Sequence, residues 1–338
     1  MYELTAICFV PPTWTGHIPR EAKISYIGFL LGAAGLAVLL FSADFMVRGG
    51  VGLARRMGIS PLIIGLSVIS VGTSAPELVT TLTATIEGAP DLALGNVVGS
   101  NLANMLLILG VAGLLRPFAC EPSIIFRDGT IMLGATALFV AFAMTGIFQF
   151  WHGATLLVGL LSYLFLAYRT ESTNSGGSLR CHETDDVPGV PKRTWVSISY
   201  LLSGLIGIVI GAELFVDGGV RVAESLGVSK AIIGLTLVAI GTSLPELAIV
   251  VTASLRGHNE IVLGNVLGSN IFNLLGITGA AALVASLPVP SVLLFFDVWV
   301  LLGVTVLLIP LMLTKGGVSR LEGGLLVFLY AAYLACQF

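Results

Sequence analysis

The sequence predicts an all-α integral membrane protein whose ten transmembrane helices form two inverted five-helix repeats. Three observations lead to this fold class. First, 56% of the 338 residues are hydrophobic and 10% are charged, whereas a soluble domain has about 25% charged residues. Second, ten apolar stretches are each long enough to cross roughly 30 Å of hydrocarbon. Third, residues 65–115 recur without a gap as residues 234–284, with 24 of 51 positions identical.

The apolar stretches divide evenly around one long polar stretch. Residues 1–23 contain three prolines and no signal-peptide pattern, and we expect an irregular lead-in there. Residues 24–168 then hold the first repeat, 169–194 form a polar cytoplasmic linker, and 195–338 hold the second repeat. The expected spans are 24–47, 59–86, 90–115, 124–145, 150–168, 195–216, 229–255, 260–285, 292–314 and 320–336.

The two repeats are expected to cross the membrane in opposite directions. Because each repeat holds an odd number of spans, the second must enter the bilayer from the other side, as in the inverted repeats of secondary transporters. The same offset of 169 relates Asp44 to Glu213 and Asp128 to Asp297. We expect the first pair to be interfacial or salt-bridged and the second pair to lie at span starts, as helix-end or interface residues.

The positions of lysine and arginine predict the orientation in the membrane. With the N-terminus outside, 12 of the 16 basic residues fall on the cytoplasmic side, and such an excess is typical of cytoplasmic loops. The others are Arg20, Lys23, Arg221 and Lys230. We therefore expect both termini outside the inner (cytoplasmic) membrane and the 169–194 linker inside.

Each copy of the duplicated segment contains a polar motif near its start. It reads Gly-Thr-Ser-Ala-Pro-Glu at 72–77 and Gly-Thr-Ser-Leu-Pro-Glu at 241–246. Proline lacks an amide hydrogen and crowds the carbonyl four residues earlier, so we expect incompletely paired carbonyls from Ser70 to Thr73 and at the equivalent residues from Ala239. In lipid, such carbonyls must face a cavity or a ligand. The Thr, Ser and Glu of each motif lie three or four residues apart, which predicts one shared helix face.

A second polar motif, Gly-Asn-Val-x-Gly-Ser-Asn-x-x-Asn, occupies residues 95–104 and 264–273. Its serine and last asparagine are four residues apart in both copies, so each pair is expected to present neutral oxygens to one side of a helix. The remaining asparagines of the motif can instead cap broken helix ends: Asn96, Asn101, Asn265 and Asn270.

Together the motifs supply carboxylates, hydroxyls, amide oxygens and backbone carbonyls. Ca²⁺ prefers about six to eight oxygens of this kind, and the absence of sulfur and imidazole from the motifs argues against soft transition metals. Two buried carboxylates require a cation or a proton. A single Gly- and Pro-containing motif would indicate only a kink or a packing face, but two equivalent glutamates favour a functional site. The net charge of −3 gives no sign of a nucleic-acid partner.

The motifs resemble the two alpha-repeats of the sodium/calcium exchanger family, within the cation/calcium antiporter superfamily. The resemblance covers all ten spans and is nearest to short prokaryotic members, because no large domain fills the 169–194 loop. It implies four cation positions arranged as a diamond, with Glu77 and Glu246 as shared central ligands. The other ligands that it implies are Thr73, Ser74, Ser100, Asn104, Thr242, Ser243, Ser269, Asn273 and the carbonyls of Ser70 and Ala239.

One position bears on the choice of ions. Some relatives carry Asp at the place of Asn273, and in potassium-dependent exchangers that Asp accompanies K⁺ use, so Asn273 favours K⁺ independence. Proton-coupled calcium antiporters usually carry an acidic residue within the second motif. Its absence here favours Na⁺ over H⁺ as the driving ion.

The sequence therefore predicts a Na⁺/Ca²⁺ antiporter that works by alternating access, with no enzyme activity. The two ions and the lipid bilayer are its expected partners, and no cofactor or obligate protein partner is indicated. The Gly-rich first and sixth spans are expected to slide past the other spans. A Ca²⁺/H⁺ antiporter that uses the same glutamates is the alternative. A passive channel fits two opposed repeats less well, and an intramembrane hydrolase with two acids sharing a proton leaves the Thr, Ser and Asn oxygens without a role.

Overall fold

Long apolar helices make up most of the protein, whose computed structural model describes residues 20–119, 122–173, 189–226, 239–314 and 317–337. Within these residues, seven helices are long and apolar enough to cross a membrane, and one bent helix pair is an eighth candidate. Of the two other predicted spans, 229–255 lies partly outside the described residues, and 320–336 corresponds to a helix that begins with Arg320 and carries Glu322 in its first turn. The count of ten therefore stays a prediction.

Most of the described elements recur in the same order in the two halves of the chain. In the first half they are α1 (Arg20–Met57), α2 (Pro61–Ile64), η1 (Gly65–Ile69), α3 (Ser70–Thr73), α4 (Ala75–Ile86), α5 (Pro90–Leu102), η2 (Ala103–Ile108), α6 (Leu109–Leu115), β1 (Phe118–Ala119), α7 (Pro122–Ala143), β2 (Ile147–Phe148) and α8 (Phe150–Thr173), where η denotes a π-helical turn. In the second half they are α9 (Thr194–Ser225), α11 (Ala239–Thr242), α12 (Leu244–Arg256), α13 (Asn259–Ile271), η6 (Phe272–Ile277), α14 (Thr278–Val284), β3 (Leu287–Pro288), η7 (Leu293–Asp297), α15 (Val298–Thr314), β4 (Gly317–Val318) and α16 (Arg320–Gln337).

The boundaries of the expected lead-in and linker differ in detail from the sequence analysis. Residues 1–19 lie outside the described part, whereas residues 20–23 already belong to α1. Likewise, α8 continues to Thr173 and α9 begins at Thr194, and residues 174–188 between them are not described. Helices often continue beyond the apolar stretch that predicts them, because polar residues also form helical turns outside the hydrocarbon.

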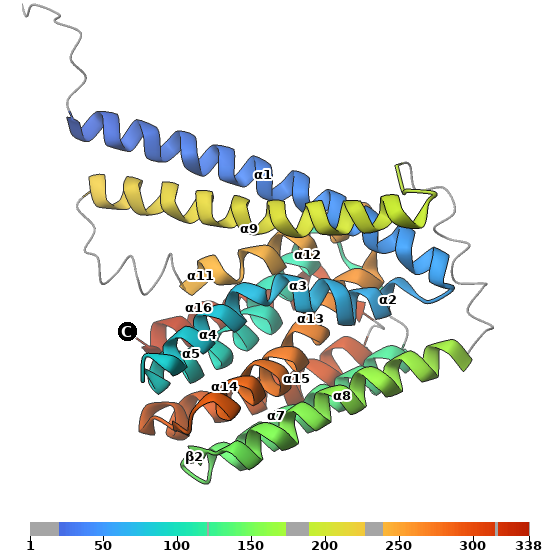
Figure 1. Cartoon of the computed structure of the whole chain (residues 1–338), viewed down its shortest axis with the longest axis vertical. Helices are drawn as coiled ribbons and strands as arrows, with labels where there is room; N and C mark the ends of the chain where they lie inside the picture. The colour runs from blue at the N-terminus through green and yellow to red at the C-terminus, as the bar shows by residue number, and fades with distance from the viewer. Residues whose placement is uncertain (1–19, 120–121, 174–188, 227–238, 315–316, 338) are drawn as a thin grey trace, which may run out of the picture.

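Helices α1 and α9 run side by side along one face of the molecule (Figure 1). Glycines bring their backbones into contact: a Cβ atom on Gly35 would lie 2.4 Å from the Phe215 nitrogen, and one on Gly211 would lie 2.6 Å from the Leu39 nitrogen. Small residues permit such close packing of membrane helices. The two helices therefore form one tightly joined pair that covers the broken helices beneath it.

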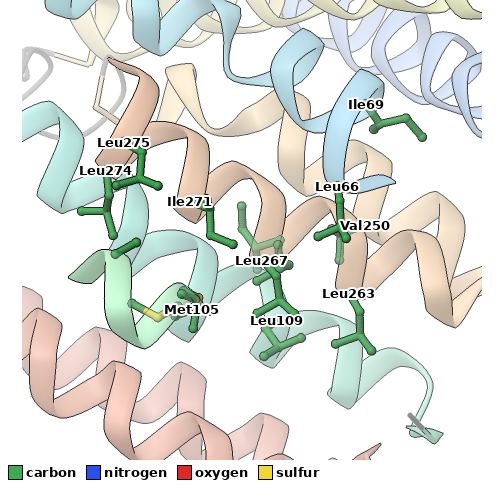
Figure 2. Close-up of a cluster of buried hydrophobic side chains, with 14 of the residues drawn as sticks. Leu66, Ile69, Met105, Leu109, Val250, Leu263, Leu267, Ile271, Leu274 and Leu275 are labelled. Atoms are coloured by element: carbon green, nitrogen blue, oxygen red, sulfur yellow. The ribbon is translucent and has the colours of Figure 1, made fainter. Parts of the chain in front are cut away.

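The centre of the fold consists of the segments that carry the second polar motif. In the segment Asn259–Val284, 83% of the apolar window is buried inside the protein, against 28% in α1. Leu263, Leu267 and Ile271 of α13 belong to one buried cluster with Leu66 of η1 (Figure 2). A span that is buried on all sides packs against protein rather than lipid, so this motif lies in the protein interior.

Two short antiparallel ladders join the halves, and the all-α prediction did not include them. Strand β1 pairs with β4 through Phe118 and Val318, and β2 pairs with β3 through Phe148 and Leu287. Each ladder connects a segment of one half to a segment of the other. Strands of two residues are too short to show an alternating pattern in the sequence, which is why they were missed.

Candidate ion-binding site

Each Gly-Thr-Ser-x-Pro-Glu motif lies where a helix is interrupted. The axes of the two helices meet at 45° around Ser74, between α3 and α4. The second copy is interrupted in the same way at Ser243, between α11 and α12. The proline of each motif falls in the first turn of the new helix, where an amide hydrogen is not needed. The interruptions place Glu77 and Glu246 in the first turns of α4 and α12.

The carbonyl of Ser70 is paired, contrary to the expectation from the sequence. It accepts the amide hydrogen of Ser74, with an N–O distance of 2.9 Å. The expectation of incompletely paired carbonyls from Ser70 to Thr73 was wrong at Ser70, because the proline at position 76 removes the donor to the carbonyl at position 72 and leaves the donor to Ser70 in place. The Thr73 hydroxyl lies 3.3 Å from the same Ser70 oxygen. In the second copy, Ala239 begins α11 at the equivalent place.

Two hydrogen bonds connect the halves at the glutamates. Ser74 Oγ donates to Glu246 Oε1 at 2.8 Å, and Ser243 Oγ donates to Glu77 Oε1 at 3.3 Å. Both carboxylates are 1% exposed, and among the described residues neither Oε2 atom has a hydrogen-bond partner. Each serine therefore contacts the glutamate of the opposite half. The sequence predicted that each serine shares a helix face with the glutamate of its own motif, but the observed hydrogen bonds go to the glutamate of the other motif.

The second motif brings further buried polar atoms to the centre of the fold. Both amide atoms of Asn104 and of Asn273, and the hydroxyl of Ser269, have no hydrogen-bond partner within the described part of the chain. Asn104 and Asn273 are each 1% exposed, and Ser100 is 5% exposed. Buried polar groups are nearly always paired. These atoms thus require a partner that the described protein groups do not supply.

Two π-helical turns, η2 and η6, were missed by the sequence analysis. They contain Asn104 and Asn273, and they follow directly on the α-helices that carry Ser100 and Ser269. Turns of this type are frequent at functional sites. No local sequence signal distinguishes a π turn from the α-helix around it.

The inner asparagines of the second motif do not cap helix ends. They lie inside α5 and α13: Asn96, Asn101, Asn265 and Asn270. Asn96 Nδ2 donates to the Glu77 carbonyl at 3.2 Å and to Thr81 Oγ1 at 3.0 Å. Asn265 Oδ1 accepts a hydrogen bond from Thr73 Oγ1 at 3.2 Å. The sequence analysis missed both as neighbours of the site, although their fixed spacing from the serines could have suggested it.

Acidic residues outside the motifs follow the expectations only in part. Asp44 forms ion pairs with Arg48, at 2.8 Å, and with Arg256 of α12, which confirms the salt-bridge prediction for this residue. Asp128 is 0% exposed and lies inside α7, and Asp297 is 8% exposed. Asp128 therefore does not lie at the helix end itself, and the alternative that it lies at the membrane interface stays a prediction. The Arg127 guanidinium lies 2.9 Å from the Asp128 carboxylate and offsets the cost of burying this charge.

The donor atoms suit a hard cation. Carboxylate, hydroxyl, amide and carbonyl oxygens are the ligands that Ca²⁺ takes. Among the described residues, no group of three or more His, Cys, Asp or Glu side chains could hold a metal ion. Apolar spans, interrupted helices and buried carboxylates at their centre define a multi-span membrane protein of the transporter class.

Comparisons with known proteins agree with this class. The family model described as sodium/calcium exchanger protein matches twice, at residues 27–169 and 196–338. The chain is 34% identical over 345 residues to the sodium/calcium exchanger MaX1 of Methanosarcina acetivorans, covering 92% of this chain and 99% of that protein. It is 35% identical over 303 residues to the putative antiporter CaxA of Alkalimonas amylolytica, covering 88% and 95%.

A solved structure shows the same fold. The sodium-calcium exchanger NCX_Mj, soaked with Na⁺ and Sr²⁺, superposes with a TM-score of 0.79 at 32% identity, covering 92% of this chain and 98% of the other. The chain therefore belongs to the sodium/calcium exchanger family, in its short prokaryotic form, and is a cation/calcium antiporter.

Proposed function

We propose that this protein exchanges Na⁺ for Ca²⁺ by alternating access at a site centred on Glu77 and Glu246. The observation that carries the proposal is the reciprocal bonding of Ser74 to Glu246 and of Ser243 to Glu77. It supports a single site built from both halves. Two carboxylates balance the charge of one Ca²⁺, and the same oxygens serve Na⁺ when Ca²⁺ is absent. Competition for these oxygens couples the two fluxes.

The proposed ligands surround the two carboxylates. The hydroxyls that now donate to Glu77 and Glu246 keep lone pairs for a cation, because a hydroxyl has one hydrogen and two lone pairs. The amides of Asn104 and Asn273 add neutral oxygens, and without a further carboxylate there the site favours Na⁺ over H⁺. The full proposed set is Glu77, Glu246, Thr73, Ser74, Thr242, Ser243, Ser100, Ser269, Asn104, Asn273 and the carbonyls of Ser70 and Ala239.

The proposed setting is the inner membrane. The relative YrbG of Escherichia coli is 35% identical over 256 residues, covers 74% of this chain, and is an inner membrane protein by name. The family model matches two segments that begin 169 residues apart, which supports two five-span repeats. An inverted arrangement with both termini outside follows from the odd span number and the arginine distribution. The α1–α9 pair then slides across the fixed site to change its access.

Ion flux in proteoliposomes tests the proposal. An outward-directed Na⁺ gradient should drive ⁴⁵Ca²⁺ uptake without K⁺, and Glu77→Gln or Glu246→Gln should abolish it, because one remaining carboxylate does not balance Ca²⁺. Uptake that needs only a pH gradient would select the Ca²⁺/H⁺ alternative. Unsaturable flux without a counter-ion would select a channel. Uptake that is unchanged in Glu77→Gln would place the site elsewhere.

A further inference from the structure

We propose that Asn265 is a positioning residue of this site. Its side-chain oxygen takes the hydrogen of the Thr73 hydroxyl, and this keeps one lone pair of the Ser70 carbonyl available to a cation. The inference rests on the proposed function, because Thr73 and Ser70 act there as cation ligands. It adds a residue that touches no ion itself.

The Thr73 hydroxyl has one hydrogen. The Glu246 carboxylate lies near it, and two neutral acceptors are within hydrogen-bond distance. They are Asn265 Oδ1 at 3.2 Å and the Ser70 carbonyl at 3.3 Å. The Ser70 carbonyl already accepts the Ser74 amide at 2.9 Å. A carbonyl oxygen has two lone pairs, so a second hydrogen bond from Thr73 would use both. Donation to Asn265 leaves one lone pair free.

The backbone of α13 holds Asn265 firmly against α3. Ser70 Oγ donates to the Gly264 carbonyl at 3.2 Å and lies 3.4 Å from the Asn265 carbonyl. A Cβ atom on Gly264 would lie 2.6 Å from the Leu62 carbonyl, so only glycine permits this approach. Asn265 and Thr73 are both 0% exposed. Since this hydroxyl is buried, the choice among its protein acceptors fixes where its hydrogen points. A cation held between Thr73 and Glu246 turns the hydrogen away from the carboxylate, which leaves Asn265 and Ser70 as the acceptors.

Asn96, the equivalent of Asn265 in the first half, makes different hydrogen bonds, and one residue difference between the halves explains why. Asn96 uses Nδ2 to hold the Glu77 carbonyl and the Thr81 hydroxyl on its own half. The residue equivalent to Thr81 is Val250, which offers no hydrogen-bond acceptor. Asn265 Nδ2 accordingly has no partner among the described residues, and the Asn265 amide oxygen faces Thr73 of the opposite half.

Removal of the Asn265 oxygen should weaken Na⁺ binding more than Ca²⁺ binding. In Asn265→Leu with a cation at Glu246, the Ser70 carbonyl is the acceptor left for the Thr73 hydrogen, which then occupies the lone pair that is proposed for Na⁺. Loss of a partner that orients a metal ligand commonly lowers metal affinity about 10- to 100-fold. We expect the Na⁺ concentration for half-maximal exchange to rise about tenfold or more, and the Ca²⁺ value, which depends chiefly on the two carboxylates, to change less than about threefold.

A double-mutant cycle with Thr73→Val tests whether Asn265 acts through Thr73. In the Thr73→Val background there is no hydroxyl to orient, so Asn265→Leu should cause no further loss of Na⁺ affinity. Asn96→Leu is the matched control, and its effect should add to that of Thr73→Val. Additive losses for Asn265→Leu, or equal losses for Na⁺ and Ca²⁺, would overturn the inference.

Asn265→Asp serves if Asn265→Leu does not fold, because it keeps an acceptor oxygen. In that background Thr73→Val should cost as much Na⁺ affinity as it does in the wild type, and a smaller cost would overturn the inference. Protection of the protein against heat by Na⁺ and by Ca²⁺ provides a readout without transport. If the wild type shows neither flux nor protection, the proposed function fails. If it shows both and the cycle is additive, only the role of Asn265 fails.

Discussion

Ser74 donates its hydroxyl hydrogen to Glu246 Oε1 over 2.8 Å, and the two residues belong to different halves of the chain. Ser243, which lies 169 positions after Ser74, donates in the same way to Glu77, which lies 169 positions before Glu246, over 3.3 Å. Each of these two carboxylates therefore accepts its hydrogen bond from a serine of the opposite half. A site of this kind exists only when both halves are folded against each other.

The first prediction concerns these serines. Ser74→Ala should raise the Ca²⁺ concentration for half-maximal uptake by about 10- to 100-fold, because Glu246 loses the donor that orients it. Ser243→Ala should have a smaller effect, since its bond to Glu77 is longer. The measurement is ⁴⁵Ca²⁺ uptake at varied Ca²⁺. Ser199→Ala is the control, because Ser199 is exposed and bonds to the Val196 carbonyl. An effect no larger than that of the control would contradict the prediction.

A third carboxylate should make transport depend on pH. In Asn273→Asp, the new side chain replaces an amide that has no partner among the described residues, beside two carboxylates that already balance one Ca²⁺. Like charges in a buried site cannot all stay ionised, so the variant must bind a proton or another cation. We expect its Ca²⁺ uptake to change between pH 6 and 8 more steeply than that of the wild type. Asn104→Asp should act in the same direction, and identical pH profiles would refute this.

The duplicated motifs, related by an offset of 169, indicated Glu77, Glu246, Ser74 and Ser243, which two hydrogen bonds join across the halves. Buried glutamates are so costly that their partners could be sought only in the other polar motif residues. The direction of each contact could not be predicted. Ser74 lies near Glu77 in sequence, yet it bonds to Glu246, because the helix interruption at Ser74 sets the side-chain directions.

Other features depend on contacts between distant segments and leave no local pattern. The π turns η2 and η6 have the same apolar composition as the α-helices that they join. The contact of Asn265 with Thr73 requires α13 to pass close to α2 and η1 at Gly264, and it also depends on Val250 where the first half has Thr81. The effect of the Thr81-to-Val250 difference on Asn265 can be recognised only when the structure shows how the two halves pack.

The close contact of α1 and α9 leads to the third prediction. Gly211→Ala puts a Cβ atom 2.6 Å from the Leu39 nitrogen, so the two helices must move apart. Overpacking of this kind costs about 1–3 kcal/mol, and the melting temperature in detergent should fall. Gly32→Ala on the same pair is the control, because nothing lies within 4 Å of its Cβ position in the described structure. Equal melting temperatures for the two variants would be inconsistent with this packing.

The ion pair between Asp44 and Arg256 leads to the fourth prediction. It joins α1 to the last turn of α12, and the two side chains are 18% and 30% exposed. Arg256→Gln should lower the free energy of unfolding by about 1–2 kcal/mol, more than an exposed pair contributes and less than a buried one. Asp44→Asn should act similarly, and the double variant should lose little more than either single variant.

A matched control for that ion pair lies within α9. Asp217 and Arg221 form an exposed pair one turn apart at 3.0 Å, and it joins no second element. Asp217→Asn should cost only about 0.3–0.5 kcal/mol. If Asp217→Asn and Arg256→Gln destabilise the protein equally, the Asp44–Arg256 pair does not link α1 to α12 energetically.

The last prediction concerns pH and stability. His258 lies in the turn between α12 and α13 and is 6% exposed. Its burial, followed by the nearby charges of Arg256 and Arg55, lowers its pKa from 6.5 to about 4. Below pH 6.5 the unfolded chain therefore binds a proton that the folded chain does not bind. The unfolded state binds more protons, so stability falls as the pH decreases from 6.5 towards 4.

Asn at position 258 should remove part of this dependence, because its side chain does not titrate. We expect the melting temperature of His258→Asn to fall less than that of the wild type between pH 7 and 5. Arg55→Gln should give an intermediate slope, since it removes one of the two charges that lower the pKa of His258. The decisive measurement is the order of the three slopes of melting temperature against pH. If the slope of the wild type is no steeper than that of His258→Asn, protonation of His258 does not destabilise the folded state. The turn would then have to move and expose this side chain when it is protonated.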